Sequence, residues 1–340
     1  MKTEEANTIL VTGANGLIGR WLVPVLLDRG YQVIAAMRQS RHRAEEFQVW
    51  VQQHTRMPFQ AERLQICEFS LEQVESLFQS LPEHEIVAVY HLAAAYHWGL
   101  DKQYAHRVNV EASERLMEQV ATLPNLKRFI WIGGYRVAQA PNLSPQKLYQ
   151  TLGGYEASKL LAHQHMKHKA AQLNLPWTAL HPSAVIGDSQ TGETIQLVGI
   201  GELIKQLQQK KLPVLPGNSN TLVPLVHVDF VAEFAARILE HEEAIHQEYW
   251  LLDDNTPALP ALIERIASHL SLKPPRLHMP VWILKRLPAF MLPGSKESLS
   301  FIAEDRYNIE STLHQARKMG IDHLLPINNL EAWVDQIAAM

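Results

Sequence analysis

The sequence is poor in cysteine, in long apolar runs and in charge of one sign. Cys67 is the one cysteine among 340 residues, which excludes an internal disulfide and suits a reducing compartment. No apolar run approaches the roughly 20 residues of a membrane span, and the short charged N-terminus lacks the apolar core of a signal peptide. The formal net charge of -4 argues against a nucleic-acid or anionic-membrane partner recognised through bulk charge. These absences predict a soluble, cytoplasmic protein.

The hydrophobic pattern favours a large α/β fold. Apolar strand-like runs alternate with amphipathic helical stretches through the first half of the chain, as in a doubly wound parallel sheet with helices on both faces. The expected strands are Thr8–Val11, Gln32–Met37, Arg63–Cys67, Ile86–Tyr90, Arg128–Ile132 and Trp177–Leu180. The expected helices are Leu17–Arg29, which contains Pro24, then Leu71–Gln79, Tyr104–Thr122 and Gly154–Asn174.

Three glycines separate the first expected strand from the first expected helix, where residues 12–19 spell TGANGLIG. Gly13 allows a tight turn, Gly16 lets the backbone approach a pyrophosphate, and Gly19 permits close helix–strand packing. The free N–H groups and the dipole of the helix attract the anion. The turn predicts a dinucleotide site that also includes the intervening residues Asn15, Leu17 and Ile18. An ordinary strand-to-helix turn is the alternative, because the spacing is GxxGxxG and a glycine-rich turn alone is a weak signal.

The composition of the chain changes after Pro182, where polar, glycine-containing loops begin. Residues 223–240 are typical of a short strand and a helix over Phe230–Leu239 capped by Asp229, and we expect them to return to the sheet. We therefore predict a Rossmann-type nucleotide-binding domain over residues 1–182 with a return segment over about 222–250. Residues 183–221 and 251–340 then form a smaller substrate-binding region that is largely C-terminal.

A tyrosine and a lysine four residues apart stand near the start of the last expected helix. The spacing of Tyr155 and Lys159 in YEASK places both side chains on one helix face. An ammonium beside a phenol favours the phenolate and lowers the tyrosine pKa from about 10 toward a range useful for acid–base chemistry. A surface YxxxK pair is common by itself, but the glycine turn upstream argues against a chance occurrence. The pair therefore predicts an acid–base site.

Five ordered segments of the chain resemble the extended short-chain dehydrogenase/reductase family. They are TGANGLIG, HLAA at residues 91–94, Asn109 in RVNV, YEASK and LHPSAVIGD. The family fold is a Rossmann domain with a smaller C-terminal substrate domain. The resemblance implies that Tyr155 exchanges a proton with the substrate and that Lys159 holds the cofactor ribose. It also implies backbone contacts to the cofactor at Ala93, Ala94 and Pro182.

The segment HPSAVIGDSQTGET, with VPLVHVDFVAEFAA downstream, is similar to passages of the thioester-reductase and fatty-acyl reductase branch, although His181 stands where arginine is usual there. This similarity implies a small-molecule carbonyl or acyl substrate and hydride transfer with Tyr155 as the acid. A nucleotide-sugar epimerase or dehydratase is the enzymatic alternative, because the same scaffold hosts those reactions. The usual oligomeric state of the family also implies a homodimer through the helices at residues 104–122 and 154–174.

The residues after the second expected strand favour NADP(H) over NAD. Arg38 occupies the position where an NAD-binding protein usually carries an acidic residue for the ribose 2′-hydroxyl. An arginine pairs instead with a 2′-phosphate, and Arg41 or Arg43 would assist it. A solvated basic loop is the alternative. Glu68, with its neighbour Phe69, follows the third strand where the family often has an adenine-contacting aspartate, so Glu68 either contacts the adenine or faces water.

Two glycines replace the Ser-Ser or Ser-Thr that the family usually has after the strand before the active site. Gly134 therefore offers no hydroxyl to the substrate oxygen, and loss of one such donor costs on the order of 3 kcal/mol, or about 100- to 1000-fold in rate. Three explanations stand open: another group donates, the site works with a weaker pocket, or the protein is an NADP-binding regulator with a degraded site. Tyr135, Tyr96 and His97 are the nearest substitute donors.

The histidines do not predict a metal site. His163, His165 and His168 follow YEASK on one helix, but by spacing His165 and His168 alone share a face, and no carboxylate or cysteine completes a set. We therefore expect no metal and place these histidines on a solvated surface. We likewise expect His91 to be packed at a strand end and Asn109 to hydrogen-bond from a helix to a loop.

Overall fold

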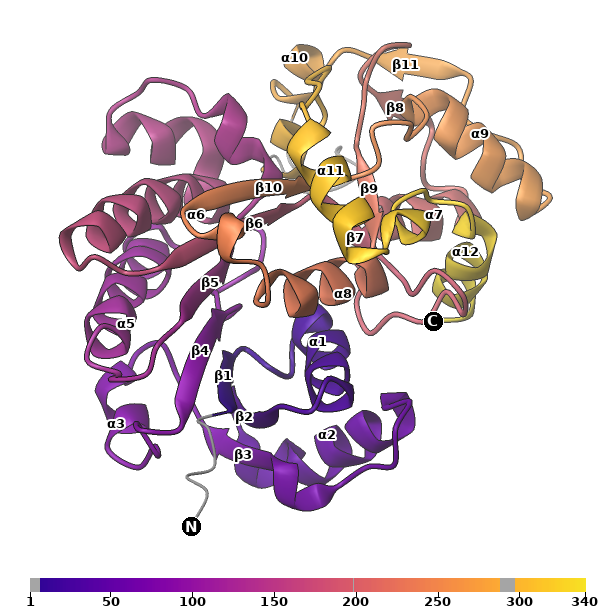
Figure 1. Cartoon of the computed structure of the whole chain (residues 1–340). Coiled ribbons are helices and arrows are strands. Elements are labelled where there is room, and N and C mark those ends of the chain that lie inside the picture. The colour runs from indigo at the N-terminus through magenta and orange to yellow at the C-terminus, as the bar shows by residue number, and fades with distance from the viewer. Residues whose placement is uncertain (1–6, 198, 288–296) are drawn as a thin grey trace.

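A sheet of seven parallel strands forms the centre of the protein, shown in Figure 1 as a computed structural model that describes residues 7–197, 199–287 and 297–340. The strands are β1 (Thr8–Thr12), β2 (Gln32–Met37), β3 (Leu64–Glu68), β4 (Ile86–His91), β5 (Arg128–Ile132), β6 (Trp177–Pro182) and β10 (Gln247–Leu251). Their order in the sheet is β10-β6-β5-β4-β1-β2-β3. The order reverses between β1 and β4, which is the point where open α/β sheets bind ligands.

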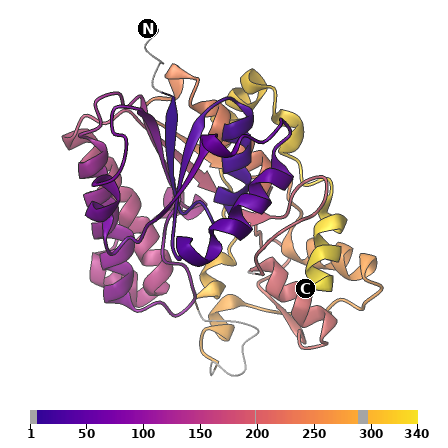
Figure 2. The same ribbon diagram turned by 90° about the horizontal axis from the view of Figure 1, so that it is seen from below.

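Helices cover both faces of the sheet, as the view from below shows (Figure 2). One face carries α1 (Leu17–Asp28), α2 (Ser40–His54), α8 (Val228–Ile238) and α11 (Glu310–Met319). The other carries α3 (Val74–Phe78), α5 (Ala112–Val120) and α6 (Pro145–Gln172). Both strand faces are therefore buried, and β1 sends Ile9 into one apolar core and Leu10 into the other. The predicted Rossmann-type α/β fold is confirmed.

A smaller group of elements lies beyond the carboxyl ends of the strands. Its strands form two parallel pairs, β7 (Ala184–Ile186) with β9 (Leu225–His227) and β8 (Val214–Pro216) with β11 (Leu277–Met279). Helices α7 (Ile200–Gln208), α9 (Leu259–His269) and α12 (Leu330–Ala339) pack around an apolar core of their own. The short helix α10 covers Val281–Leu284. This group has its own core, separate from the two beside the central sheet.

The return of the chain to the sheet is confirmed, with one correction. Helix α8 packs against α1, and β10 pairs with β6 at the edge of the sheet. The expected cap of this helix is wrong, because His227 occupies the N-cap position and Asp229 lies in the first turn. The Asp229 carboxylate instead accepts hydrogen bonds from the backbone N–H and the hydroxyl of Ser189. Asp229 thereby ties the loop after β7 to α8.

Several helix predictions differ from the structure. Helix α2 was not expected, because Phe47 and Val51 are its buried apolar side chains and its outer face is polar. The expected helix at residues 104–122 is divided into α4 (Lys102–Ala105), a π-helical segment (His106–Glu111) and α5. Helix α6 begins at Pro145, earlier than expected, and breaks at Gly153, whose φ is 83°. The expected helix at Leu71–Gln79 is shorter, while α1 forms as expected with Pro24 inside it.

The chain shows no membrane-spanning element in its described part. None of the helices there combines the length and the apolar character that crossing a bilayer requires. Residues 1–6, on which the expected absence of a signal peptide partly rests, lie outside the described residues.

Candidate active site

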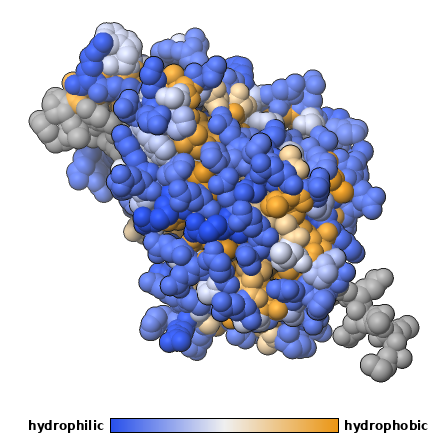
Figure 3. Space-filling view, turned by 90° about the vertical axis from the view of Figure 1, so that its left-hand side faces the viewer, coloured by the Kyte–Doolittle hydropathy of each residue, from blue (hydrophilic) through white to orange (hydrophobic). Residues whose placement is uncertain are grey.

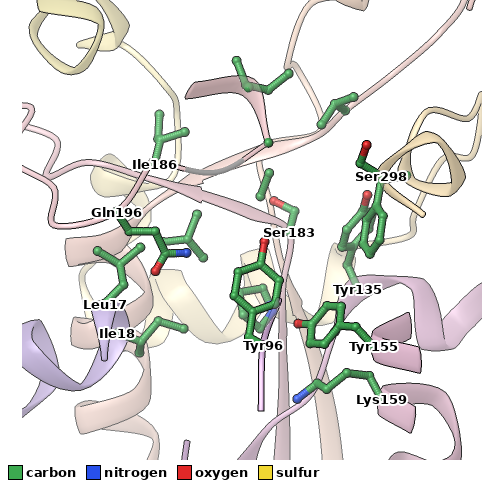
Figure 4. Close-up of a pocket in the computed structure, with 18 of the residues that line it drawn as sticks. Leu17, Ile18, Tyr96, Tyr135, Tyr155, Lys159, Ser183, Ile186, Gln196 and Ser298 are labelled. Atoms are coloured by element: carbon green, nitrogen blue, oxygen red, sulfur yellow. The ribbon is translucent and has the colours of Figure 1, made fainter. Parts of the chain in front are cut away.

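A cavity of about 400 Å³ opens at the carboxyl ends of the sheet strands (Figure 4). The turn between β1 and α1 forms one wall of this cavity. The opposite wall comes from α7, from the loop after β4 and from the segment around Ser298–Phe301. The cavity thus lies at the switch point of the sheet and joins the two parts of the fold.

The glycine turn leaves no room for side chains beside the cavity. Gly13 has a φ of 72°, and a Cβ placed on it would lie 2.7 Å from the Ala93 backbone nitrogen. A Cβ on Gly19 would lie 2.5 Å from the Ala14 carbonyl oxygen. Gly16 begins α1 without a side-chain cap, so the first N–H groups of the helix stay available to an anion. The geometry fits a dinucleotide pyrophosphate.

The structure gathers most of the predicted cofactor residues around this cavity. They are Gly13, Gly16, Leu17, Ile18, Gly19, Ala94, Tyr155, Lys159 and Pro182. Ala93 lines a small adjoining cavity of about 20 Å³ together with Ala94 and Lys159. The fold therefore brings the glycine turn and the Tyr155–Lys159 pair to one cavity.

Four predicted cofactor residues lie elsewhere. The side-chain Oδ1 of Asn15 accepts a hydrogen bond of 2.8 Å from Arg20 Nε, and Phe69 is buried in the core between the sheet and α5. Arg38 is exposed at the end of β2. Glu68 is exposed, as one of its two alternatives expected, and its carboxylate also accepts hydrogen bonds from the backbone N–H groups of Gln39 and Ser40 and so caps helix α2.

Tyr155 and Lys159 lie in the second half of α6, after the break at Gly153. The Lys159 ammonium donates to the Ile132 carbonyl oxygen at 2.9 Å, and burial lowers its pKa to about 8. The predicted lowering of the Tyr155 pKa is not found: burial raises it well above 10, and Tyr96 and Glu156 act in the same direction. Burial excludes water from the phenolate and so disfavours it, although the Lys159 ammonium lies one helical turn away.

Aromatic side chains surround the Tyr155 ring. Tyr96 lies edge-on to it with ring centroids 4.6 Å apart, and Trp98 lies at 6.0 Å. The Glu297 carboxylate holds the loop that carries Tyr96 and Trp98, because it accepts hydrogen bonds from the backbone N–H groups of Gly99 and Gly154. This carboxylate connects the loop after β4 to the start of the half of α6 that carries Tyr155 and Lys159.

The two glycines after β5 differ in their surroundings. A Cβ on Gly133 would overlap the imidazole of His181, which is fully buried on β6. A Cβ on Gly134 would meet no atom within 4 Å, and the Gly134 backbone is extended. The His181 ring therefore leaves no room for a side chain at Gly133. Nothing in the structure prevents a hydroxyl-bearing side chain at the second.

The structure separates the three proposed substitute donors. His97 is exposed, does not line the cavity, and has its ring Nδ1 3.0 Å from the Trp98 carbonyl oxygen. Tyr96 and Tyr135 do line the cavity, and Figure 4 shows both beside Tyr155. Tyr135 packs edge-on against Tyr307, which makes it part of the wall.

Ser183 is a polar group at the cavity that motif analysis missed. It follows His181 and Pro182 in LHPSAVIGD, and its hydroxyl projects toward the cavity (Figure 4). Within the described residues this hydroxyl is buried without a hydrogen-bond partner. A buried unpaired hydroxyl is costly unless a ligand pairs with it. The signal in the sequence was its place directly after Pro182.

Three distant residues form a buried polar cluster behind the cavity. The Nε2 atoms of His163 and His181 lie 3.2 and 3.0 Å from the same Glu248 oxygen, and Lys167 pairs with the other oxygen. His163 therefore does not face solvent as expected, since its side chain is 11% exposed. Glu248 supplies the carboxylate that helix spacing did not reveal, and the three residues have the composition of a metal-ligand set. Burial lowers the pKa of His181 to about 4.

The predicted packing roles of His91 and Asn109 agree with the structure. His91 is buried between the hydroxyls of Thr12 and Ser113, at 2.9 and 3.0 Å, and burial lowers its pKa to about 3. The Asn109 amide exchanges two hydrogen bonds with the Ala95 backbone and so joins its helical segment to the loop after β4. Both residues position the cavity wall.

Residues 9–251, from β1 to β10, match the NAD dependent epimerase/dehydratase family. The chain belongs to this family. The matched residues include the glycine turn, Tyr155, Lys159 and Ser183, whereas the wall segment at Ser298–Phe301 lies beyond them. The match confirms the resemblance to the extended short-chain dehydrogenase/reductase enzymes that the motifs predicted.

Two curated relatives and one solved structure show how this family member compares with known proteins. The NRPS-like oxidoreductase fscA of Fusarium equiseti is 29% identical over 199 residues, which are 54% of this chain and 18% of that protein. The chain thus spans less than a fifth of its length. Ketoreductase sphI of Aspergillus fumigatus is 24% identical over 268 residues, 68% of this chain and 74% of that one. The terminal R domain from the myxalamid PKS-NRPS biosynthetic pathway superposes with a TM-score of 0.74 at 19% identity, over 99% of this chain and 92% of that chain, and shows the same fold.

Proposed function

We propose that this family member is an NADP(H)-dependent oxidoreductase that reduces a small carbonyl or acyl compound. The observation that carries the proposal is that Tyr155 and Lys159 line the same cavity as the glycine turn. The names of the Fusarium and Aspergillus relatives, an oxidoreductase and a ketoreductase, support the same class of reaction. Residues 1–182 with about 222–250 hold the cofactor in this proposal, and residues 183–221 and 251–340 hold the substrate.

The cofactor residues fit a dinucleotide. The α1 N-terminus and the glycine turn would hold the pyrophosphate, and Lys159 would hold the nicotinamide ribose. Backbone at Ala94 and Pro182 would flank the nicotinamide. The bound cofactor supplies the hydride, and the protein supplies its position and the proton.

The chain's own groups handle the proton and the substrate oxygen. The high pKa of Tyr155 keeps its phenol protonated at neutral pH, which suits a proton donor in the direction of reduction. The buried Lys159 ammonium adds positive charge beside the site where a substrate oxygen gains negative charge. Ser183 is a further donor that faces the cavity. The apolar walls exclude competing water.

The test measures oxidation of NADPH with a panel of aldehydes, ketones and acyl thioesters. We expect turnover with an apolar member of the panel, and we expect Tyr155→Phe to lower kcat by about 100-fold or more, because general-acid catalysis contributes about 100- to 10,000-fold. Tyr104→Phe removes a phenolic hydroxyl away from the cavity and is the matched control. Full activity in Tyr155→Phe would contradict the assigned role.

The choice of NADP over NAD rests on Arg38, which is exposed at the end of β2 and free to meet a 2′-phosphate. We expect Arg38→Ala to weaken NADPH binding about 10-fold or more and to leave NADH binding unchanged, because a charge-assisted bidentate pair is lost. Arg38→Lys keeps the positive charge but cannot form the bidentate pair, so its NADPH affinity should lie between that of the wild-type protein and that of Arg38→Ala. Calorimetric titration with both cofactors measures this. Equal losses for NADPH and NADH would refute the assignment.

An NADP-binding regulator without efficient turnover is the second candidate, and the open space beside Gly134 favours it. Tight NADPH binding without turnover across the whole panel would select this function over the first. An epimerase or dehydratase reaction would instead leave the cofactor without net oxidation.

We also propose a homodimer through α5 and α6. Figure 3 shows the face where these helices lie, mostly hydrophilic with apolar side chains in separate patches. A polar surface of this kind is common in interfaces that are not obligate. Sedimentation of the full chain over a range of concentrations tests it, and a monomer at all concentrations would exclude it.

A further inference from the structure

One carboxylate lines the otherwise largely apolar substrate side of the cavity. Glu202 lies in the first turn of α7, and its neighbours along the same wall are apolar. They include Ile200, Leu203, Val223, Phe301 and Ile302. An acidic side chain among such residues loses hydration, and desolvation by burial raises the Glu202 pKa above its usual value.

The Glu202 carboxylate has no protein partner within the described part of the chain. No hydrogen bond or ion pair reaches it from those residues, and no neighbouring positive charge contributes to its pKa shift. Lys205, one turn further along α7, donates instead to the Ala338 carbonyl oxygen at 3.3 Å. A half-buried carboxylate without a partner costs stability, and a ligand that neutralises it recovers that cost.

Glu202 and the reacting groups belong to one cavity. Tyr96 connects them, because its ring lies 4.6 Å from the Tyr155 ring, centroid to centroid, while the Glu202 charge acts on its phenol. Burial and this charge together raise the Tyr96 pKa to about 12. A ligand with its carbonyl at Tyr155 can therefore extend past Tyr96 along apolar side chains and reach Glu202.

We propose that Glu202 is a binding subsite for a protonated amine carried by the apolar substrate. The substrate class is then an amino-substituted apolar carbonyl or acyl compound, and this assignment rests on the proposed reductase function for its reacting end. The amine subsite itself is a property of the cavity and does not require turnover. A charge-assisted hydrogen bond is stronger than a neutral one, so a cation suits the unpartnered carboxylate better than a hydroxyl.

The experiment compares 3-phenylpropylamine with 3-phenylpropanol, which differ in the cationic nitrogen alone. Binding to the full chain is followed by tryptophan fluorescence, because Trp98 and Trp333 line the cavity, and by calorimetry. We expect the wild-type protein to bind the amine about 10-fold more tightly than the alcohol. Glu202→Gln should abolish that preference, and Glu202→Asp should retain part of it. Glu264→Gln removes an exposed carboxylate on α9 and should keep the full preference.

The pH dependence gives a second measurement on the unchanged chain. The amine preference should fall as the pH is lowered through the raised pKa of Glu202, since the carboxyl becomes neutral while the amine stays protonated. The pH dependence tests the Glu202 subsite on its own if Glu202→Gln does not fold. Equal binding of amine and alcohol, a preference that survives Glu202→Gln, or no binding of either probe would each overturn the proposal.

Failure of the subsite and failure of the reductase function give different results. An amine preference that depends on Glu202, without NADPH oxidation on any carbonyl compound, would retain the subsite and reject the reductase. Turnover of neutral carbonyl compounds without any amine preference in binding would retain the reductase and reject the subsite.

Discussion

The two walls of the cavity differ in the room they leave for added atoms. On the cofactor wall, a Cβ on Gly13 or Gly19 would press into backbone at 2.7 or 2.5 Å. On the substrate wall, a Cβ on Gly134 would meet nothing within 4 Å, and the Ser183 hydroxyl has no described partner. The cofactor wall is thus fixed by backbone packing at these glycines, whereas the substrate wall has an open position at Gly134.

The strongest test of this contrast is Gly13→Ala. We expect loss of NADPH binding by about 100-fold or more, because the new methyl group would displace the Ala93 backbone and distort the tight turn that leads to the pyrophosphate site. The left-handed backbone adds a stability cost of about 1–3 kcal/mol. Calorimetric titration and thermal unfolding measure the two effects.

Gly30→Ala is the matched control, since Gly30 has a φ of 93° and nothing within 4 Å of its ideal Cβ. It should lower stability through the backbone conformation and leave NADPH affinity unchanged. Wild-type NADPH affinity in Gly13→Ala would show that the backbone around Gly13 does have room for a methyl group.

The adjacent glycines of the substrate wall give the next largest effect. If the missing hydroxyl limits turnover, Gly134→Ser should raise kcat, by up to about 100-fold, because an oxyanion donor contributes about that much where a site can use it. The extended Gly134 backbone and the open space accept the side chain without a stability loss. Steady-state kinetics with the best carbonyl compound of the panel measures the change.

Gly133→Ser is the paired control with the same chemical change one residue earlier. Its Cβ would overlap the His181 ring, so we expect a loss of stability of about 1–3 kcal/mol from overpacking and no gain in kcat. Equal behaviour of the two variants would refute the distinction between a closed and an open glycine position.

Features built from contiguous residues could be predicted from the sequence. The glycine turn and the YEASK pair each lie within one short segment, so their local conformation follows from spacing alone. β1 and β4 are apolar runs buried on both faces, which made them recognisable, whereas the edge strand β3 is only partly buried. Helix α2 was not predicted because few apolar side chains, Phe47, Trp50 and Val51, pack it against the core and the rest of its surface is polar.

Features assembled from distant residues could not be predicted. His163, His181 and Glu248 meet only after α6 packs on the sheet and β10 pairs with β6. Glu202 reaches the cavity because α7 folds over the ends of the strands. The fit of His181 against Gly133 likewise depends on strand pairing, so the sequence showed two glycines without showing that the first is closed by His181 and the second is open.

The smallest expected effect concerns the same His181 under acid conditions. Its folded-state pKa of about 4 lies below the unfolded value of 6.5, because burial disfavours the imidazolium. The unfolded chain therefore binds the proton first, and stability falls as the pH drops from about 6.5 toward 4, by up to about 1.4 kcal/mol per pH unit for one proton.

Urea unfolding across this pH range measures the slope of stability against pH. His181→Gln carries no titratable group and should reduce the slope, the rest of which comes from the buried His91, whereas His168→Gln, on an exposed part of α6, should leave it unchanged. An unchanged slope in His181→Gln would show that the substrate wall behind Gly133 does not bury a neutral imidazole.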